Sequence, residues 1–160
     1  MELILIRHGE AEKMNPGTED AMRHLTANGM KLLERAIPNL RMLIKDKCNT
    51  KIWASPLLRA SESAGIIAKA LKVKNIESHD FIARGDFEAF SEELQRTDSK
   101  GCLIVIGHEP FLSDWSQRIC GYTLPFKKGA SAGFALISTD PPTGNLRWLI
   151  DLKMLGRLGD

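Results

Sequence analysis

The strongest constraint on the fold is a regular alternation between short apolar runs and longer segments with helical spacing. The apolar runs lie at residues 3–6, 51–54 and 103–106, and apolar residues recur every three or four positions in the segments after them. Short apolar runs are typical of buried strands, and the three- to four-residue spacing is typical of amphipathic helices. Strands that alternate with helices favour a largely parallel sheet covered on both faces. We therefore predict an α/β fold, a three-layer α/β/α sandwich.

Capping residues predict where two of the helices begin. Thr26 is expected to cap a helix whose apolar stripe extends to Ile44, and Pro38 within that stripe predicts a kink or a break. Ser55 and Pro56 are expected to be the N-cap and the first residue of the next helix.

The second half of the chain has the same signals and a different ending. Asp86 is expected to cap a short helix, and Pro110 to open a longer one. Residues 133–138 and 146–151 have the pattern of strands, and the turn-rich segment 139–145 joins them. This arrangement predicts a C-terminal antiparallel hairpin.

The charge balance argues against two classes of partner. The 160 residues hold 22 lysines and arginines against 20 aspartates and glutamates, a formal net charge of +2. A chain balanced in this way gives no global reason to expect nucleic acid or an anionic membrane as a partner. No apolar run approaches the roughly 20 residues that a membrane-spanning helix needs. We expect a single domain over residues 1–160 that binds neither nucleic acid nor membrane.

The three cysteines are few and widely spaced. Cys48, Cys102 and Cys120 form neither a disulfide framework nor a paired metal or redox motif. The apolar stretch at residues 3–6 is too short for a signal sequence. We expect reduced thiols in a cytoplasmic protein.

Three polar clusters follow predicted strands, where ligands bind in open α/β sheets. They are residues 7–9, residues 55–59 and residues 107–110. If the three strands are neighbours, two histidines and two arginines converge on one pocket. Guanidinium groups match phosphate oxygens in pairs, and helix N-termini add backbone N–H donors. A neutral histidine can attack phosphorus, so the pocket predicts phosphoryl transfer through a phosphohistidine.

The same clusters resemble the sequence blocks of the histidine phosphatase superfamily, and the resemblance covers nearly the whole chain. The matching blocks are the Arg-His-Gly signature in residues 4–10, residues 23–26 with Gly29, residues 55–60 and residues 105–110. The short chain and residues 126–129 are most similar to protein phosphohistidine phosphatases of the SixA type. The three blocks that contain His8, Arg59 and His108, in the right order, are far more specific than one block alone.

The resemblance implies roles for particular residues. His8 would be the phosphorylated nucleophile, and Arg7, Arg59 and His108 would hold the phosphoryl group. Arg23 matches a position near the pocket and would help to bind the substrate. The resemblance implies neither a metal nor another cofactor.

The general acid is less well defined by the resemblance. By position, Asp80 matches the acidic residue that follows the second helix, and Glu77 and Glu88 are competitors for that role. A phosphohistidine leaves as an imidazole, which needs less help from an acid than an alkoxide does.

Two departures from the superfamily bear on the substrate. Ala11 stands where sugar-phosphate enzymes often have serine or threonine, and Met14 stands where they often have asparagine. No long insertion separates Arg59 from His108, so we expect an open pocket that admits a side chain of another protein. The resemblance thus predicts a phosphatase of phosphohistidine on a signalling or phosphotransfer protein.

Alternatives remain open at this point. One is a phosphatase of small-molecule phosphoesters on the same scaffold, and another is a non-catalytic module that binds phosphate. Lys127 and Lys128 either line the groove and attract an acidic partner or form a solvated pair in a loop.

Overall fold

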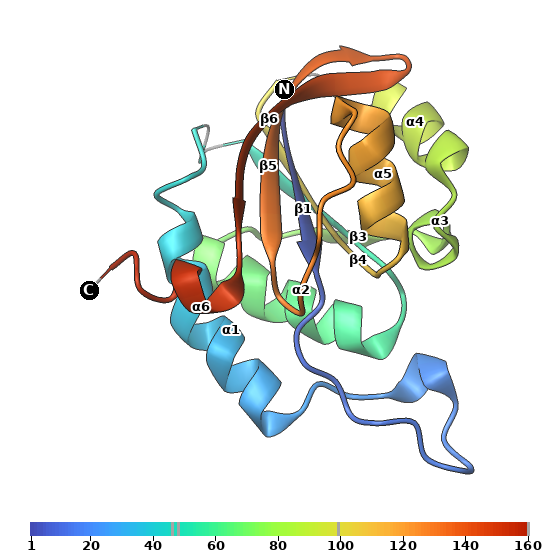
Figure 1. Cartoon of the computed structure of the whole chain (residues 1–160), viewed down its shortest axis with the longest axis vertical. Helices are drawn as coiled ribbons and strands as arrows, with labels where there is room; N and C mark the ends of the chain where they lie inside the picture. Colours follow the sequence, from blue (N-terminus) through green and yellow to red (C-terminus); the bar gives the residue numbers. More distant parts are fainter. Residues whose placement is uncertain (46, 48, 99, 160) are drawn as a thin grey trace.

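The chain folds into a central sheet with helices on both sides (Figure 1). The structure is a computed structural model that describes residues 1–45, 47, 49–98 and 100–159. Its strands are β1 (Glu2–Arg7), β2 (Thr50–Ala54), β3 (Ile76–Ser78), β4 (Cys102–Gly107), β5 (Ser131–Thr139) and β6 (Pro142–Ile150). Its helices are α1 (Ala27–Leu40), α2 (Leu58–Leu71), α3 (Asp80–Arg84), α4 (Phe87–Gln95), α5 (Phe111–Cys120) and α6 (Leu152–Leu155), with a 3₁₀ turn, η1, at Asp20–Met22.

The sheet has the strand order β3-β2-β4-β1-β5-β6. Strands β1 to β4 run parallel, and β5 and β6 add an antiparallel hairpin beside β1. The carboxyl ends of β1, β2 and β4 therefore meet at one edge of the sheet. The predicted three-layer α/β/α sandwich with a C-terminal hairpin is confirmed.

Alternating side chains of the strands build two separate cores. Ile4 and Ile6 of β1 pack with α1, α2 and α6 on one face, whereas Leu3 and Leu5 pack with α3, α4 and α5 on the other. Figure 1 shows the same division of the helices between the two faces. All four β1 side chains are fully buried, as expected for a parallel strand with helices on both sides.

Several predicted helix starts are confirmed, and one is wrong. The Thr26 and Asp86 side chains cap α1 and α4, and α5 begins directly after Pro110. The helix expected to start with Ser55 and Pro56 instead starts at Leu58. The Ser55 hydroxyl lies 2.7 Å from the Nε2 atom of His108, so it is hydrogen-bonded to the residue that follows β4 and does not cap α2.

Two further boundaries differ from the prediction in length. Helix α1 continues through Pro38 and ends two residues later, at Leu40, so the predicted break lies just beyond the proline. Ile44 is buried but lies beyond the helix. The C-terminal hairpin is confirmed, but its strands extend further, and only residues 140–141 separate them.

Two of the three cysteines lie within described elements of the fold. Cys102 is buried in β4, and Cys120 ends α5. Cys48 lies outside the described residues. In the part of the chain that the structure describes, no helix has the length and apolar character needed to cross a membrane.

Candidate active site

The pairing register of β1 and β4 brings two distant histidines together. Arg7 pairs with Gly107, so His8 and His108 are the next residues on two adjacent strands. Their ring centroids lie 5.1 Å apart, and both side chains are buried. The proximity expected from the sequence is therefore a consequence of parallel strands that end at the same level.

Hydrogen bonds fix the orientation and the tautomer of the His8 ring. The Nδ1 atom lies 2.7 Å from the carbonyl oxygen of Gly9, which can only accept, so Nδ1 carries the hydrogen. The Nε2 atom accepts a hydrogen bond from Nε of Arg59 at 3.4 Å. His8 is therefore a neutral imidazole whose Nε2 lone pair points toward the guanidinium group. A nucleophile for phosphorus needs such an unprotonated nitrogen.

Burial keeps both imidazoles neutral. Loss of hydration lowers the pKa of His8 from 6.5 to about 4, with further lowering by the positive charges of Arg59 and Arg7. Burial, and then the neighbouring His8 and Arg59, lower the pKa of His108 to about 3. Nε2 of His8 is thus unprotonated at neutral pH, the state that a nucleophile requires. Both histidines stay uncharged until an anion enters, since a nearby negative charge raises a histidine pKa.

A second contact holds the backbone next to His8. The Ser63 hydroxyl donates to the carbonyl oxygen of Arg59 at 2.7 Å and accepts from the backbone N–H of Gly9 at 3.1 Å. Ser63 lies one turn after Arg59 on the buried face of α2. This serine ties the β1 end to the helix that carries the arginine, and no family block had singled it out.

Ser55 fixes the ring of the second histidine, His108. Its hydroxyl oxygen lies 2.7 Å from Nε2 of His108 and accepts the backbone N–H of Leu57 at 3.2 Å. The Nδ1 atom of His108 is buried and has no hydrogen-bond partner among the described residues. Buried unpaired nitrogens are costly and gather at functional sites.

Asp20 binds both Arg23 and Arg59. Its Oδ2 atom accepts from Arg59 at 3.1 Å, and its backbone oxygen accepts from the same guanidinium group at 2.9 Å. Its Oδ1 atom lies 2.7 Å from Nη2 of Arg23. Arg23, in turn, donates to the carbonyl oxygen of Glu12. The sequence analysis missed Asp20, although its position three residues before Arg23 is a usual spacing for an ion pair.

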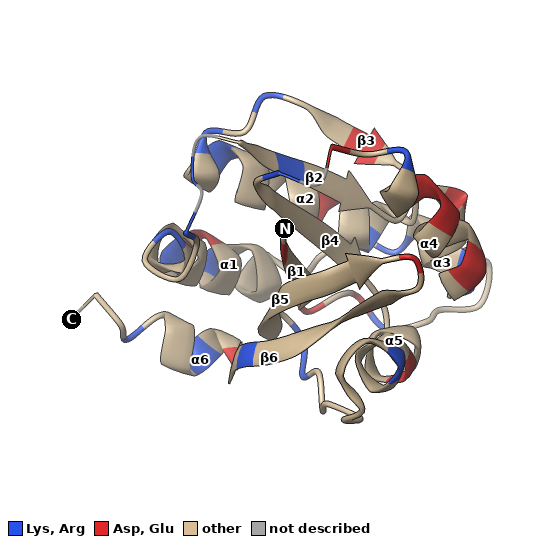
Figure 2. Ribbon diagram, turned by 90° about the horizontal axis from the view of Figure 1, so that it is seen from above, with Lys and Arg blue, Asp and Glu red and all other residues tan. Residues whose placement is uncertain are grey.

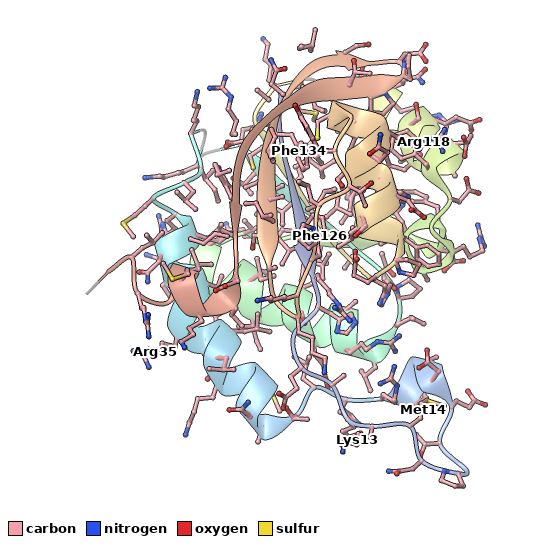
Figure 3. All side chains as sticks on the ribbon, viewed as in Figure 1. Lys13, Met14, Arg35, Arg118, Phe126 and Phe134 are labelled. Atoms are coloured by element: carbon pink, nitrogen blue, oxygen red, sulfur yellow. The ribbon has the colours of Figure 1, made fainter. Side chains whose placement is uncertain are left out.

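The segment around η1 projects beyond the carboxyl edge of the sheet before it returns to α1 (Figure 1). Lys13 and Met14 lie on its outgoing arm (Figure 3), and Met14 is 58% exposed. The returning arm pairs with the outgoing one through Ala11 and Leu25. Asp20 and Arg23 thus reach the site from one side, while β1 and β4 reach it from the sheet.

Arg7 joins the site to the segment before β5. It donates to the carbonyl oxygen of Phe126 at 2.9 Å (labelled in Figure 3), and its Nε atom is buried without a partner among the described residues. The backbone N–H of Gly129 lies 3.1 Å and 3.0 Å from the carbonyl oxygens of Arg7 and His8. Gly129 has a φ of +75°, a conformation that favours glycine. The segment that carries Lys127 and Lys128 is thereby held at the carboxyl end of β1.

The three carboxylates considered for the general acid lie in different places. Asp80 is the first residue of α3, is exposed, and directly follows the β3 end of the same sheet edge. Ile82, two residues later, packs beside Gly107. Glu77 pairs with His79, and Glu88 pairs with Arg118 on α5. No hydrogen bond or ion pair within the described ranges connects Asp80 to His8.

The arrangement suits an in-line transfer of a phosphoryl group. One neutral nitrogen is available for attack, three guanidinium groups surround it, and a second imidazole lies beside it. Arginine forks bind the oxygens of phosphate in a planar, paired geometry. Such donors stabilise a phosphoryl group more strongly as negative charge develops on its oxygens.

Solved structures share this fold along almost the whole chain. A SixA protein histidine phosphatase in complex with tungstate has a TM-score of 0.82, with 23% identity over 97% of this chain and 99% of its own. A candidate SixA phosphohistidine phosphatase from Agrobacterium tumefaciens has a TM-score of 0.76, with 18% identity over 94% and 97%. A mutant phosphoserine phosphatase from Entamoeba histolytica in complex with phosphoserine has a TM-score of 0.71, with 14% identity over 95% and 98%.

Comparison with curated protein sequences gives no match. The sequence pattern of the histidine phosphatase superfamily (branch 1), in contrast, matches residues 3–111, which include the strand ends that carry both histidines. The chain therefore belongs to the histidine phosphatase superfamily, branch 1, a family of metal-independent phosphatases.

Proposed function

We propose that this phosphatase removes the phosphoryl group from phosphohistidine on a signalling or phosphotransfer protein, through a covalent phospho-His8 intermediate. The observation that carries the proposal is the state of His8. Its Nδ1 hydrogen is held by Gly9, and its Nε2 lone pair faces Arg59 beside His108. Binding of phosphate alone would not need a buried, unprotonated imidazole in this orientation.

The first step needs no net proton transfer to or from the protein. Nε2 of His8 bonds to phosphorus while the bond from phosphorus to the substrate imidazole breaks. The substrate reacts in the form that is protonated on its other ring nitrogen, so its imidazole keeps that hydrogen and leaves as a neutral ring. His8 keeps its Nδ1 hydrogen and becomes a phosphoimidazolium. Arg7, Arg59 and His108 act on the transferring oxygens, and Arg23 supports them through Asp20.

The second step restores the enzyme. Water adds to phosphorus, and the bond from phosphorus to Nε2 breaks. The electron pair of that bond returns to Nε2, and both hydrogens of the water leave with dihydrogen phosphate. His8 is again the neutral Nδ1–H tautomer that Gly9 holds. The balance of protons explains why a phosphohistidine depends little on a general acid such as Asp80.

The substrate class is supported by what lies between Arg59 and His108. Between α2 and β4, the described residues form β3, α3 and α4. Strand β3 belongs to the sheet, and the apolar residues of α3 and α4 pack on it. They are core elements, not a cover over the carboxyl edge. A site without such a cover suits a phosphorylated side chain on a folded partner. The likeness to SixA structures supports the same class.

The direct test is to trap the intermediate. The enzyme is mixed with a phosphohistidine-containing phosphotransfer domain carrying radioactive phosphate, quenched in alkali within milliseconds to seconds, and digested. We expect alkali-stable, acid-labile phosphate on the peptide that contains His8. The His8→Ala variant should lose the label and the turnover while its circular dichroism spectrum stays unchanged. Near-normal turnover by His8→Ala would disprove the mechanism.

A substrate panel separates the proposal from its rival, a phosphatase of small phosphoesters. The phosphotransfer domain is compared with phosphoserine, sugar phosphates and nucleotides. We expect the highest kcat/KM for the phosphohistidine protein. A strong preference for a small phosphoester would overturn the substrate class and leave the phospho-His8 step intact. A site that binds phosphate and never becomes labelled would identify a non-catalytic module.

A further inference from the structure

A basic hollow adjoins the nucleophile and extends away from it toward α6. It has a volume of about 530 Å³, and Arg7, Lys127, Lys128 and Lys153 line it. Arg7 directly precedes His8 at the end of β1. The backbone N–H of Gly129 donates to the carbonyl oxygens of Arg7 and His8, so the loop that carries Lys127 and Lys128 lies at the same strand end. We call this site the basic hollow. It begins at Arg7, which we also propose to bind the phosphoryl group, and extends beyond the proposed active site.

The lysines of the basic hollow are free to bind an incoming group. Lys127, Lys128 and Lys153 are exposed, and none makes an ion pair with another residue that the structure describes. Lys128 is near enough to Glu10 to contribute to the lowered pKa of that carboxyl, whose main cause is the hydrogen bond from Thr26. The positive charge of the hollow is thus only partly compensated.

The two carboxylates that line the hollow already have other partners. Glu10 accepts from the Thr26 hydroxyl at 2.7 Å. Asp151 caps α6 by accepting the backbone N–H of Met154 at 2.8 Å. Both carboxylates therefore serve the local structure, and neither neutralises a lysine by direct contact.

Charge is also unevenly distributed over the rest of the molecule. Figure 2 shows acidic residues gathered over α3 and α4 and basic residues along α1, β2 and α6. A partner with a negative surface is therefore repelled on the α3–α4 side and attracted on the α6 side. The small net charge of +2 conceals this separation.

We infer that the basic hollow binds an acidic segment of the phosphoprotein substrate, next to its phosphohistidine. The inference rests on the proposed function and adds a substrate preference: carboxylates that flank the phosphorylated histidine. A segment in the hollow would contact Lys127, Lys128 and Lys153 while its phosphoryl group reaches Arg7 and His8. Complementary charge of this kind mainly raises the rate of association and makes it sensitive to salt.

The test uses two phosphohistidine peptides of equal length. One carries aspartate and glutamate on both sides of the phosphohistidine, and the other carries asparagine and glutamine at the same positions. Phosphoimidazole is the small substrate that does not extend into the hollow. Wild-type enzyme is compared with the triple variant K127Q/K128Q/K153Q and with a control variant of equal charge, K47Q/K72Q/K74Q. The control lysines line a different hollow, beside the amino end of β2.

For wild type, we expect kcat/KM to be about tenfold higher for the acidic peptide, with the preference lost at high salt. K127Q/K128Q/K153Q should lose most of this preference through KM, whereas K47Q/K72Q/K74Q should keep it. Hydrolysis of phosphoimidazole by the same variants reports whether the site is folded.

The other outcomes would overturn the inference. Equal losses on both peptides and on phosphoimidazole, in a variant with the circular dichroism spectrum of wild type, would mean that the lysines act on the phosphoryl group itself. An unchanged preference in K127Q/K128Q/K153Q would mean that the hollow has no part in binding. If wild type hydrolyses phosphoesters but neither peptide nor phosphoimidazole, the proposed function fails, and the inference fails with it. Activity on both peptides without a preference overturns the inference alone.

Discussion

The Asp20 carboxylate accepts a hydrogen bond from the Arg59 guanidinium group at 3.1 Å, at the same time as Arg59 donates to Nε2 of His8. Asp20 also binds Arg23, so one carboxylate orients two of the arginines around the site. The Asp20 side chain is half exposed. A phosphoryl group that binds Arg59 would compete with the Asp20 carboxylate for the same guanidinium group. Asp20 is thus a positioning residue whose negative charge also opposes the binding of anions.

The Asp20→Asn variant should separate these two effects. Removal of the charge should lower the dissociation constant for inorganic phosphate by a few-fold, because the guanidinium groups lose a competing anion. The loss of arginine orientation should lower kcat by about tenfold. Isothermal titration calorimetry gives the first quantity and steady-state kinetics the second. Weaker phosphate binding together with an unchanged kcat would contradict this account.

Arg59→Ala should lower the rate of phosphoryl transfer at least about a hundredfold, the usual cost of removing one donor to a developing oxyanion. The same substitution removes the hydrogen bond to Nε2 of His8. Stopped-flow measurement of phospho-His8 formation reports the step directly. Arg59→Lys is the matched control, because it keeps the charge and loses the planar fork. A loss below threefold in Arg59→Ala would be incompatible with its assigned role.

Much of the fold was predictable because the strongest signals are local. The apolar runs that become β1 and β4 need no tertiary information, and the Thr26 and Asp86 caps act within one helical turn. The convergence of His8 and His108 followed from the fold class, since adjacent parallel strands end at one edge.

The parts that were missed depend on contacts between distant segments. Asp20 lies in a single 3₁₀ turn without apolar periodicity, and only the folded chain brings it to Arg59. Ser55 has the residue type of a helix cap, but its hydroxyl is hydrogen-bonded to the nearby His108 ring. Ser63 is a small polar residue on a buried helix face, and its role depends on the approach of Gly9. The three-residue strand β3 and the one-turn helix α6 carry too few residues for a periodic signal.

Asp80→Asn tests whether the exposed carboxylate at the start of α3 is the general acid. An alkoxide needs a proton when it leaves, whereas the imidazole of phosphohistidine leaves as a neutral ring. We expect the loss in kcat/KM for phosphoserine to exceed the loss for phosphoimidazole by at least tenfold. Glu88→Gln is the control, because its carboxylate is paired with Arg118 on the outer surface. Equal losses on both substrates would assign Asp80 a structural role.

The protonation of His8 can be measured directly by nitrogen-detected NMR. Burial holds its pKa at about 4, so the ligand-free enzyme at pH 6 should show a neutral ring with hydrogen on Nδ1. Addition of tungstate or phosphate should shift the titration toward higher pH, since a nearby anion favours the charged imidazolium. A His8 ring that titrates near 6.5 without ligand, or carries its hydrogen on Nε2, would contradict the tautomer.

The lowered histidine pKa values also predict how stability depends on pH. Unfolded histidine binds a proton near pH 6.5, whereas His8 and His108 in the folded protein resist protonation down to about 4 and about 3. The unfolded state therefore binds more protons as the pH falls, and folding stability decreases from about pH 6.5 downward. At one pKa unit per ~1.4 kcal/mol, the loss by pH 4 should be roughly 3 kcal/mol for each of the two histidines.

Urea unfolding of wild type and of the double variant His8→Asn/His108→Gln, at several values between pH 7 and pH 4, measures this difference. The pKa of His24 is raised, mainly by its hydrogen bond to Glu62, and has the opposite effect on the pH dependence. That contribution is the same in both proteins and cancels in the comparison. The double variant should lose clearly less stability on acidification than wild type does. Parallel curves for the two proteins would mean that the site histidines are solvated and already charged at mildly acidic pH.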